Sequence, residues 1–370
     1  MTVQGPGRWA VVDDLLAEKS VVVVTGAGGV GKTTVSAALG LRAAVAHDRR
    51  VLVVTVDPAR RLADALGVNG LAGEAVLVPV GESSGRLWVL MVEMGQAWDD
   101  LVHRCAPDPV TAADLLANDL YRSLTTRFVA SHDYVALDHL GLLDEKPYDL
   151  IVVDTPPGEH THDIFAAPNR LREFFDSRLL RWLTAGVGGG LGRFAARPFL
   201  AVAERLLGGD FLTQISLFFH LFAKLRPRLL ARIERVEAIL ESERSAVVEV
   251  WAADGVRPNQ RADDRADVVI VNRVLPATSL SIVPGRRDGS NSRRQLELQS
   301  TVADPDLELI DDKELRASVR ALLVGVRDIR LTIPKHAEVA LVARTPGGVN
   351  DLDDLHRLVD EAVAMSPPSP

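Results

Sequence analysis

The sequence predicts a layered α/β fold whose sheet is mostly parallel and sandwiched by helices, with an additional helical insertion. Three observations lead to this prediction. Valine-rich apolar runs recur along the chain and are continuous rather than alternating, which is typical of strands covered on both faces. Helical patterns separate several of these runs. The composition, 47% hydrophobic and 25% charged over 370 residues, is that of a globular chain with a sizeable core.

Seven strands are predicted, each a short run of β-branched and large apolar residues bounded by turn formers. They begin at Val21, Val51, Leu87, Asp149, Ala246, Asp267 and Glu338. Between strands, helical periodicity is predicted over residues 32–46 and 108–128.

The strand signal disappears between Phe165 and Glu243, where helical periodicity is interrupted only by a glycine-rich run. We therefore predict a first part of the core at residues 1–164, a helical insertion at 165–245 and a C-terminal part of the core at 246–370. Residues 279–294 are rich in Ser, Gly and Arg without any period, which predicts a mobile loop.

Composition also excludes several classes of protein. Cys105 is the only cysteine, so one chain can form neither a disulfide nor a Cys-x-x-Cys pair, and a cytoplasmic location is expected. The N-terminal residues lack the order of a secretory signal, and the longest nearly apolar stretch, 211–223, is too short to span a bilayer. The net charge of −8 argues against coating nucleic acid, so no nucleic-acid partner is expected.

A glycine-rich loop follows the first predicted strand, and it satisfies the pattern Gly, four residues, Gly, Lys, then Ser or Thr. The loop comprises Gly26, Ala27, Gly28, Gly29, Val30, Gly31, Lys32, Thr33 and Thr34. Glycines let backbone N–H groups approach phosphate oxygens, and the N-terminus of the following helix adds positive charge. Lys32 would neutralise the β and γ phosphates, and Thr33 would offer its hydroxyl to Mg²⁺. The loop therefore predicts a nucleotide site.

Two aspartates end predicted strands, where open α/β sheets place their ligands. Asp57 follows the second strand and could orient a water molecule, although it could equally cap the helix that begins near Ala59. Asp154 ends the strand that starts at Asp149, as does the magnesium-associated carboxylate of phosphate-loop NTPases, with helix capping as the alternative. Three strand ends would then converge on one triphosphate.

These motifs together resemble the arsenical-pump and tail-anchored-protein-targeting ATPase family, a deviant Walker A group of P-loop NTPases. Its first switch, Asp-Pro-Ala-His-Ser/Asn-Leu, is matched by residues 57–62 except at Arg60 and Arg61. Its second switch, Asp-Thr-Ala-Pro-Thr-Gly-His-Thr, is matched at Asp154, Thr155, Pro157, His160 and Thr161. The resemblance covers most of residues 21–183 well and the remainder loosely. The two switches and the helical insertion favour this family over the partitioning and nitrogenase-reductase ATPases.

The resemblance implies specific roles and the cofactors ATP and Mg²⁺. Asp57 would polarise the attacking water, Thr33 and Asp154 would hold Mg²⁺, and Asn272 would hydrogen-bond adenine. A turn or cap after a strand is the alternative for Asn272. Pro346, which precedes the last predicted helix, is a second candidate for lining the base pocket.

Departures from the family pattern carry information about partners. Family members place a second lysine after the first loop glycine, and it reaches the partner subunit's phosphates; this chain has Ala27 there. The loss of such a cation could slow hydrolysis about a thousandfold unless another chain provides it, so we hypothesise a heterodimer with a paralogous ATPase that supplies the lysine. A homodimer is the other expected partner arrangement. Glu159 replaces the glycine of the second switch. The metal-binding cysteines of the family are absent, which makes arsenite stimulation unexpected.

The predicted insertion carries an apolar stripe followed by basic residues. The stripe consists of Phe211, Leu212, Ile215, Phe218, Phe219 and Phe222. Such a stripe usually packs in a core, and the alternative is a surface for a hydrophobic client, a membrane protein or an anionic membrane, which would place the protein peripherally at the membrane.

The leading functional prediction is a dimeric ATPase in which ATP binding and hydrolysis move the helical segment. The alternatives are a catalytically weak ATP-binding regulatory subunit, which Ala27 and Glu159 favour, and a partitioning-type ATPase. A metabolic kinase also stays open, because the loop indicates phosphate binding and not the acceptor.

Overall fold

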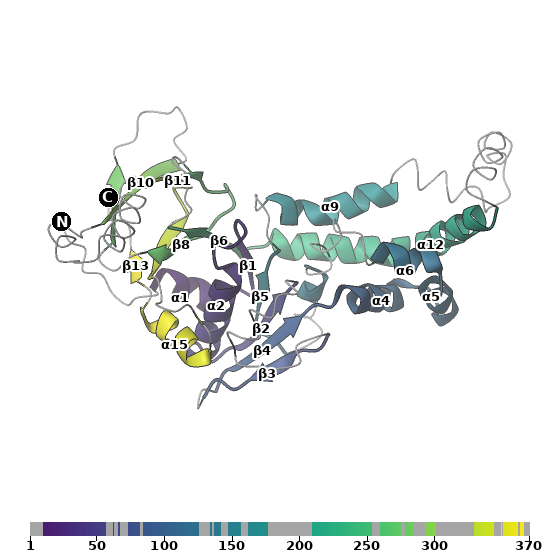
Figure 1. The fold of residues 1–370 in the computed structure, drawn as a ribbon, viewed down its shortest axis with the longest axis horizontal. Coiled ribbons are helices and arrows are strands. Elements are labelled where there is room, and N and C mark those ends of the chain that lie inside the picture. The colour runs from purple at the N-terminus through teal and green to yellow at the C-terminus, as the bar shows by residue number, and fades with distance from the viewer. Residues whose placement is uncertain are drawn as a thin grey trace, which may run out of the picture. The chain divides into compact units, whose positions relative to one another are not determined.

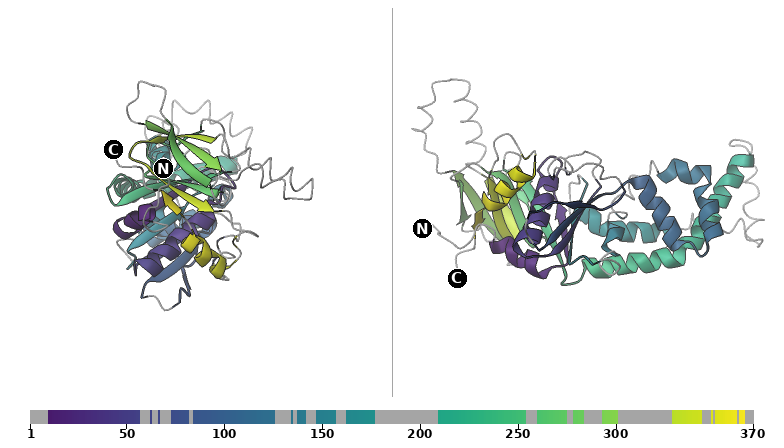
Figure 2. Two further views of the ribbon diagram at one scale, coloured as in Figure 1. Left: turned by 90° about the vertical axis from the view of Figure 1, so that its left-hand side faces the viewer. Right: turned by 90° about the horizontal axis from the view of Figure 1, so that it is seen from below.

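The computed structural model of the chain describes residues 10–56, 62, 66, 73–81, 84–125, 134, 137–141, 147–156, 162–176, 209–253, 260–274, 278–283, 293–300, 329–343, 349, 351–361 and 363–365. The chain divides into two compact units (Figures 1 and 2). The first, here the sheet unit, comprises Met1–Met91, Leu143–Asp163 and Ser242–Pro370. The second, the helical unit, comprises Val92–Leu142 and Ile164–Glu241. Sequence had placed residues 92–142 in the first core segment.

The sheet unit is built on a nine-stranded sheet in the order β13-β12-β8-β6-β1-β5-β2-β4-β3. Seven strands run parallel, and the edge strands β3 and β13 are antiparallel to their neighbours. The strands are β1 (Val21–Thr25), β2 (Arg50–Thr55), β3 (Val76–Val78), β4 (Arg86–Met91), β5 (Leu150–Asp154), β6 (Ser245–Ala252), β8 (Val268–Val274), β12 (Glu338–Ala343) and β13 (Val363–Met365). The predicted α/β class and all seven predicted strands are confirmed.

Register aligns the ends of the central strands. Asp154, the last residue of β5, pairs with Val24 on one side and with Thr55 on the other. Because these strands are parallel, their carboxyl ends lie at one edge of the sheet, where the loop after β1 begins.

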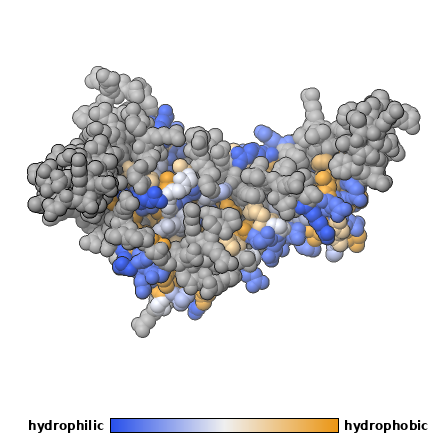
Figure 3. All heavy atoms as spheres, in the orientation of Figure 1, coloured by the Kyte–Doolittle hydropathy of each residue, from blue (hydrophilic) through white to orange (hydrophobic). Residues whose placement is uncertain are grey.

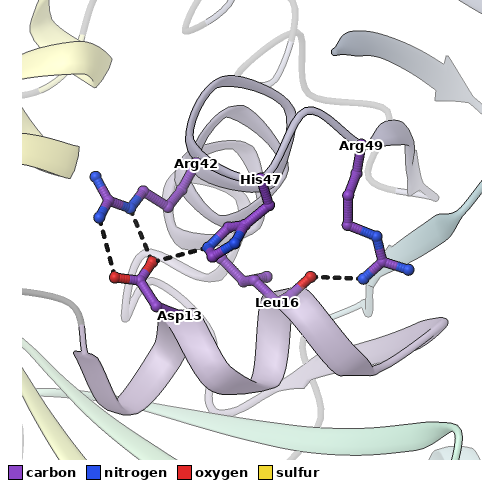
Figure 4. A network of polar contacts seen from close by, with 5 residues as sticks. All are labelled: Asp13, Leu16, Arg42, His47 and Arg49. Atoms are coloured by element: carbon purple, nitrogen blue, oxygen red, sulfur yellow. Dashed lines mark hydrogen bonds and ion pairs between the residues drawn. The ribbon is translucent and has the colours of Figure 1, made fainter. Parts of the chain in front are cut away.

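Three helices of the sheet unit pack their apolar residues into one core with the sheet: α1 (Ala10–Glu18), α2 (Lys32–Ala46) and α15 (Leu352–Glu361). Helix α2 coincides with the predicted helix. A polar network joins α1 to α2 (Figure 4): Asp13 accepts hydrogen bonds from Arg42 at 2.9 and 3.0 Å and lies 3.1 Å from His47. Arg49 donates to the carbonyl groups of Leu16 and Lys19, at the C-terminus of α1.

A second, four-stranded sheet lies in the C-terminal half of the sheet unit, in the order β7-β11-β10-β9. Its strands are β7 (Gln260–Arg261), β9 (Thr278–Val283), β10 (Arg293–Ser300) and β11 (Ile329–Pro334). The predicted mobile loop at 279–294 is therefore wrong at both ends, because β9 and β10 pair antiparallel there. The Ser, Gly and Arg residues between β9 and β10 dominate this stretch and conceal the few strand residues at its two ends.

The helical unit contains α4 (Met94–Cys105), α5 (Pro109–Leu116), α6 (Asp119–Thr125), the 3₁₀ turn η2 (His139–Gly141), most of α9 (His162–Asp176) and α12 (Gly209–Leu240). The helix predicted over 108–128 is two helices. Asn118 divides them, since its Oδ1 accepts the backbone N–H groups of Leu120 and Tyr121 and so begins α6.

The prediction that the apolar stripe packs in a core is confirmed for two of its members, Phe218 and Phe222, whose side chains are buried. Phe218 and Phe222 stack with their ring centroids 5.4 Å apart and are 4% and 7% exposed, whereas Leu217 beside them is 45% exposed. Hydrophobic and hydrophilic residues are interspersed on the face shown in Figure 3. None of the helices in the described part of the chain is both long and apolar enough to cross a membrane.

Candidate nucleotide site

The glycine-rich loop connects β1 to α2 and packs closely against neighbouring strands. Gly31 immediately precedes α2 with φ 97°, a left-handed conformation that favours glycine. A Cβ atom at Gly31 would lie 2.3 Å from Nδ2 of Asn272, and one at Gly26 would lie 2.3 Å from the carbonyl oxygen of Val250. Glycine is therefore required at both positions by close contact with the ends of β8 and β6.

Lys32 begins α2 and folds back over the loop. Its ammonium group donates to the carbonyl oxygens of Gly26 at 2.9 Å and Ala27 at 3.0 Å, and the residue is buried. The positive charge is thereby held at the loop beside the N-terminus of a 15-residue helix, which attracts anions through its exposed N–H groups. Ala27 itself is solvent-exposed.

Asp154 is 1% exposed and is held by three hydroxyl groups. Thr33 donates to its Oδ2 at 2.7 Å and Thr55 donates to the same oxygen at 2.8 Å, while Ser36 donates to Oδ1 at 3.3 Å. Burial raises the pKa of Asp154 to about 6, although the hydrogen bonds from Thr33 and Thr55 and the charge of Lys32 oppose this shift.

This donor set fits a magnesium ion that is shared with a nucleotide. Mg²⁺ prefers hard oxygen ligands and is usually held by one or two carboxylates or hydroxyls together with substrate phosphates. The Thr33 hydroxyl and the Asp154 carboxylate supply two such oxygens within 2.7 Å of each other. Within the described residues no group of three or more His, Cys, Asp and Glu side chains could hold a metal alone.

Asn272 lies at the C-terminal end of β8 and contacts the loop. Its Nδ2 donates to the carbonyl oxygen of Val30 at 3.0 Å, and its Oδ1 accepts the backbone N–H of Arg273 at 2.9 Å. The Arg273 side chain donates to the carbonyl oxygen of Gly29 at 2.5 Å. The structure therefore brings Asn272 to the loop, and adenine contact by Asn272 stays a prediction.

Not every predicted site residue can be located. Asp57 and Pro346 lie outside the described residues, as do residues 157–161 of the second switch. Lys32, Thr33, Asp154 and Asn272, in contrast, come together around the loop.

Three residues that contact this site, Thr55, Ser36 and Arg273, were not predicted from the sequence. Thr55 ends an otherwise apolar strand, and Ser36 lies one turn after Thr33 on α2, so both positions carried a weak signal. Arg273 gave none, because an arginine after a strand is ordinarily a solvated side chain.

Comparison with known proteins agrees with this geometry. The family model of the anion-transporting ATPases matches residues 19–300. An uncharacterized protein of Streptomyces coelicolor is 32% identical over 268 residues, which cover 69% of this chain and 62% of the relative. The arsenical pump-driving ATPase of Escherichia coli is 26% identical over 351 residues, covering 92% of this chain and 54% of the relative.

The ATPase asna-1 of Caenorhabditis elegans is 26% identical over 182 residues, which cover 45% of this chain and 51% of that protein. The chain thus spans between 51% and 62% of the length of these three relatives. Because the family model matches well over half of its residues, the chain belongs to the anion-transporting ATPase family.

Proposed function

We propose that this chain binds Mg²⁺-ATP at the loop between β1 and α2 and hydrolyses it. The observation that carries the proposal is the arrangement of Lys32, Thr33 and Asp154, in which a loop cation lies beside a hydroxyl and a carboxylate that are joined at 2.7 Å. Family membership supports ATP as the nucleotide.

The residues divide the work as follows. Lys32 and the loop N–H groups bind the β and γ phosphates, and Thr33 and Asp154 hold the magnesium ion. Magnesium, when bound, neutralises charge that develops on the phosphate oxygens. Asp57, from its place in the motif, orients the attacking water for in-line displacement. Thr55 and Ser36 orient the Asp154 carboxylate through their hydroxyl groups.

We further propose that hydrolysis is coupled to the helical unit and occurs in a dimer, either of two identical chains or with a paralogous ATPase. The burial of Phe218 and Phe222 favours a structural role for part of the aromatic stripe, so a hydrophobic client or membrane partner would use other residues of that unit. The absence of clustered cysteines disfavours an arsenite-stimulated pump. If the partner of the helical unit is a membrane protein, the chain would associate peripherally with the membrane.

Calorimetric titration with ATP tests the binding step. The wild-type chain should bind ATP more tightly with Mg²⁺ than with a chelator, and Lys32→Ala should weaken binding by about 100-fold. Lys224→Ala, which removes an exposed lysine of α12, is the matched control and should bind normally. Phosphate release should then be abolished by Asp57→Asn with little change in ATP affinity. Equal affinity of the wild type and Lys32→Ala would refute the proposal.

A second candidate, a catalytically weak regulatory subunit of a heterodimer, is favoured by one observation. Ala27 is exposed at the loop and offers no charge where the family places a lysine. ATPase assays of the chain alone and mixed with a lysine-bearing paralogue separate the candidates. Brisk turnover by the chain alone excludes the second candidate, and tight binding without turnover in either sample selects it.

A further inference from the structure

Two consecutive residues at the end of β8 bind two consecutive carbonyl groups of the loop. The Asn272 side chain donates a hydrogen bond to the carbonyl oxygen of Val30 at 3.0 Å, and the Arg273 side chain donates one to the carbonyl oxygen of Gly29 at 2.5 Å. The contact is close as well as polar, since a Cβ atom on Gly31 would meet the Asn272 side chain at 2.3 Å. The loop is thus held from β8 by a pair of side chains.

The backbone of β8 is distorted where these side chains arise. Arg273 has φ 61°, a left-handed conformation that is uncommon for a residue with a side chain. Pairing with β12 also shifts at this point, because Val271 pairs with Leu341 while Val274 pairs with Ala343. Three steps along β8 therefore match two along β12, as in a β-bulge, a device that redirects side chains near functional sites.

The geometry of the peptide group says what such contacts do. In a planar trans peptide the C=O of one residue and the N–H of the next point in opposite directions. Fixing the carbonyl groups of Gly29 and Val30 toward β8 therefore fixes the N–H groups of Val30 and Gly31 toward the other side of the loop. Lys32 donates instead to the carbonyl groups of Gly26 and Ala27, at the beginning of the loop.

We propose that Arg273 is a positioning residue for phosphate binding: its guanidinium group, through the carbonyl of Gly29, holds the N–H of Val30 in the direction of the phosphates. Asn272 does the same for Gly31. The inference rests on the proposed nucleotide site and adds to it a residue that acts through the backbone, without touching the base or the ribose.

Arg273→Gly is the informative variant. Glycine adopts φ 61° without strain, so the fold should be kept and the thermal midpoint of the nucleotide-free chain should stay the same or rise. Loss of a charge-assisted hydrogen bond should weaken ATP binding by about tenfold. Arg265→Ala is the matched control, since it removes an exposed arginine that precedes the opposite end of β8 and should leave ATP affinity unchanged.

Inorganic tripolyphosphate is the decisive probe, because it carries phosphates and no nucleoside. If Arg273 acts through the loop, Arg273→Gly should lose affinity for tripolyphosphate and for ATP by the same factor, in calorimetric titrations of the full chain. Arg273→Lys retains a cationic donor and should restore part of both affinities. A loss confined to ATP would overturn the proposal, since it would mean that Arg273 contacts the nucleoside.

The outcome also separates this inference from the proposed function. If Lys32→Ala weakens binding of both ligands and Arg273→Gly weakens neither, the positioning role is wrong and the nucleotide site stands. If the wild-type chain binds neither ligand, both proposals are overturned.

Discussion

Asp154 is deeply buried, and the magnesium role proposed for it requires its charge. At 1% exposure it is surrounded by three hydroxyl donors, and burial raises its pKa to about 6. A group with this pKa is partly protonated just below neutral pH. Because only the carboxylate form is a good ligand for Mg²⁺, protons and magnesium compete for this side chain.

We therefore expect magnesium-dependent ATP affinity to decline as the pH falls below about 6, by up to about tenfold per pH unit. Calorimetry between pH 5 and pH 8, in matched ionic strength, measures the effect. Phosphate groups titrate in the same range, so Asp154→Asn serves as the control that retains only the titration of the ligand. A wild-type profile identical to that of Asp154→Asn would contradict the prediction.

The same pKa has the opposite consequence for the stability of the nucleotide-free chain. The folded state binds more protons than the unfolded state between the ordinary aspartate pKa of 3.8 and about 6, so stability falls as the pH rises through this window. Asp154→Asn should then be more stable than the wild type at pH 7, by about 3 kcal/mol, and about equally stable at pH 4. Thermal or denaturant unfolding checks this, and a destabilised Asp154→Asn chain at pH 7 would be inconsistent with it.

How far individual site residues can be predicted depends on where their signal lies. Lys32, Thr33 and Asp154 were predictable because a spacing pattern or a strand end marks them. Thr55 and Arg273 were not, since their contacts with the site arise from strand register and from a bulge, which are properties of pairing between distant segments.

Helix α2 packs tightly against the sheet at Gly40. A Cβ atom there would meet Cγ2 of Val53 at 2.4 Å and Cδ1 of Leu87 at 3.2 Å. Alanine favours a helix over glycine by about 1 kcal/mol, but overpacking a core costs about 1–3 kcal/mol. Close packing should therefore outweigh helix propensity at this position.

Gly40→Ala is accordingly expected to lower the free energy of unfolding by about 1–2 kcal/mol in urea denaturation. Val45→Ala in the same helix is the control, because Val45 is 39% exposed and the change should be neutral or slightly stabilising. A stabilised Gly40→Ala chain would show that α2 can move away from the sheet at little cost.

The ion pair between Asp13 of α1 and Arg42 of α2 should make the stability of the fold depend on pH (Figure 4). Burial alone would raise the pKa of Asp13, but hydrogen bonds from Arg42 and His47 outweigh it and lower the pKa below its usual value. A lowered aspartate pKa contributes stability that is present above the unfolded pKa of 3.8 and is lost as the pH falls through the folded value.

Arg42→Ala should thus cost about 1 kcal/mol at pH 7, with the difference from wild type shrinking below pH 4. Denaturant titrations at several pH values measure this difference, and a cycle with Asp13→Asn isolates the pair. A difference that persisted undiminished at pH 2 would show that Arg42 acts through packing instead.

Elements were predictable in proportion to the regularity of their sequence. The parallel strands are buried on both faces and carry unbroken apolar runs, so all seven were found. Residues 279–294 were predicted to be a loop because the Ser, Gly and Arg residues between β9 and β10 outweigh the few strand residues at each end of this stretch. Helix α4 was missed, and Asn118 split a predicted helix, because a single capping side chain overrides a continuous periodic pattern.

In the part of the chain that the structure describes, the nucleotide site and the helical unit are built from different residues. Every described residue of the site belongs to the sheet unit, whereas the helical unit has its own charge cluster around a buried carboxylate. In this cluster Asp138, 3% exposed, accepts hydrogen bonds from Arg104 at 3.0 Å and from Arg232 at 2.8 and 3.0 Å. Removing a buried partner leaves uncompensated charge.

Asp138→Ala should destabilise the helical unit by about 3 kcal/mol while ATP affinity at the loop changes little. Hydrogen exchange followed by mass spectrometry should show faster exchange in α4 and α12 and unchanged exchange in β1 and α2. Calorimetry of the same variant provides the second readout. Loss of ATP binding in parallel with loss of protection would mean that the two units fold as one cooperative system.

The order of the strands also bears on biosynthesis. Strand β1, which leads into the phosphate loop, lies between β5 and β6, and β6 begins only at Ser245. In a nascent chain on the ribosome, one edge of β1 therefore has unpaired backbone N–H and C=O groups until residues beyond Ser245 have been translated. Such an edge can pair with other strands and is prone to aggregation. Most of the helical unit, residues 92–142 and 164–241, is translated during this interval, before β6 can cover that edge of β1.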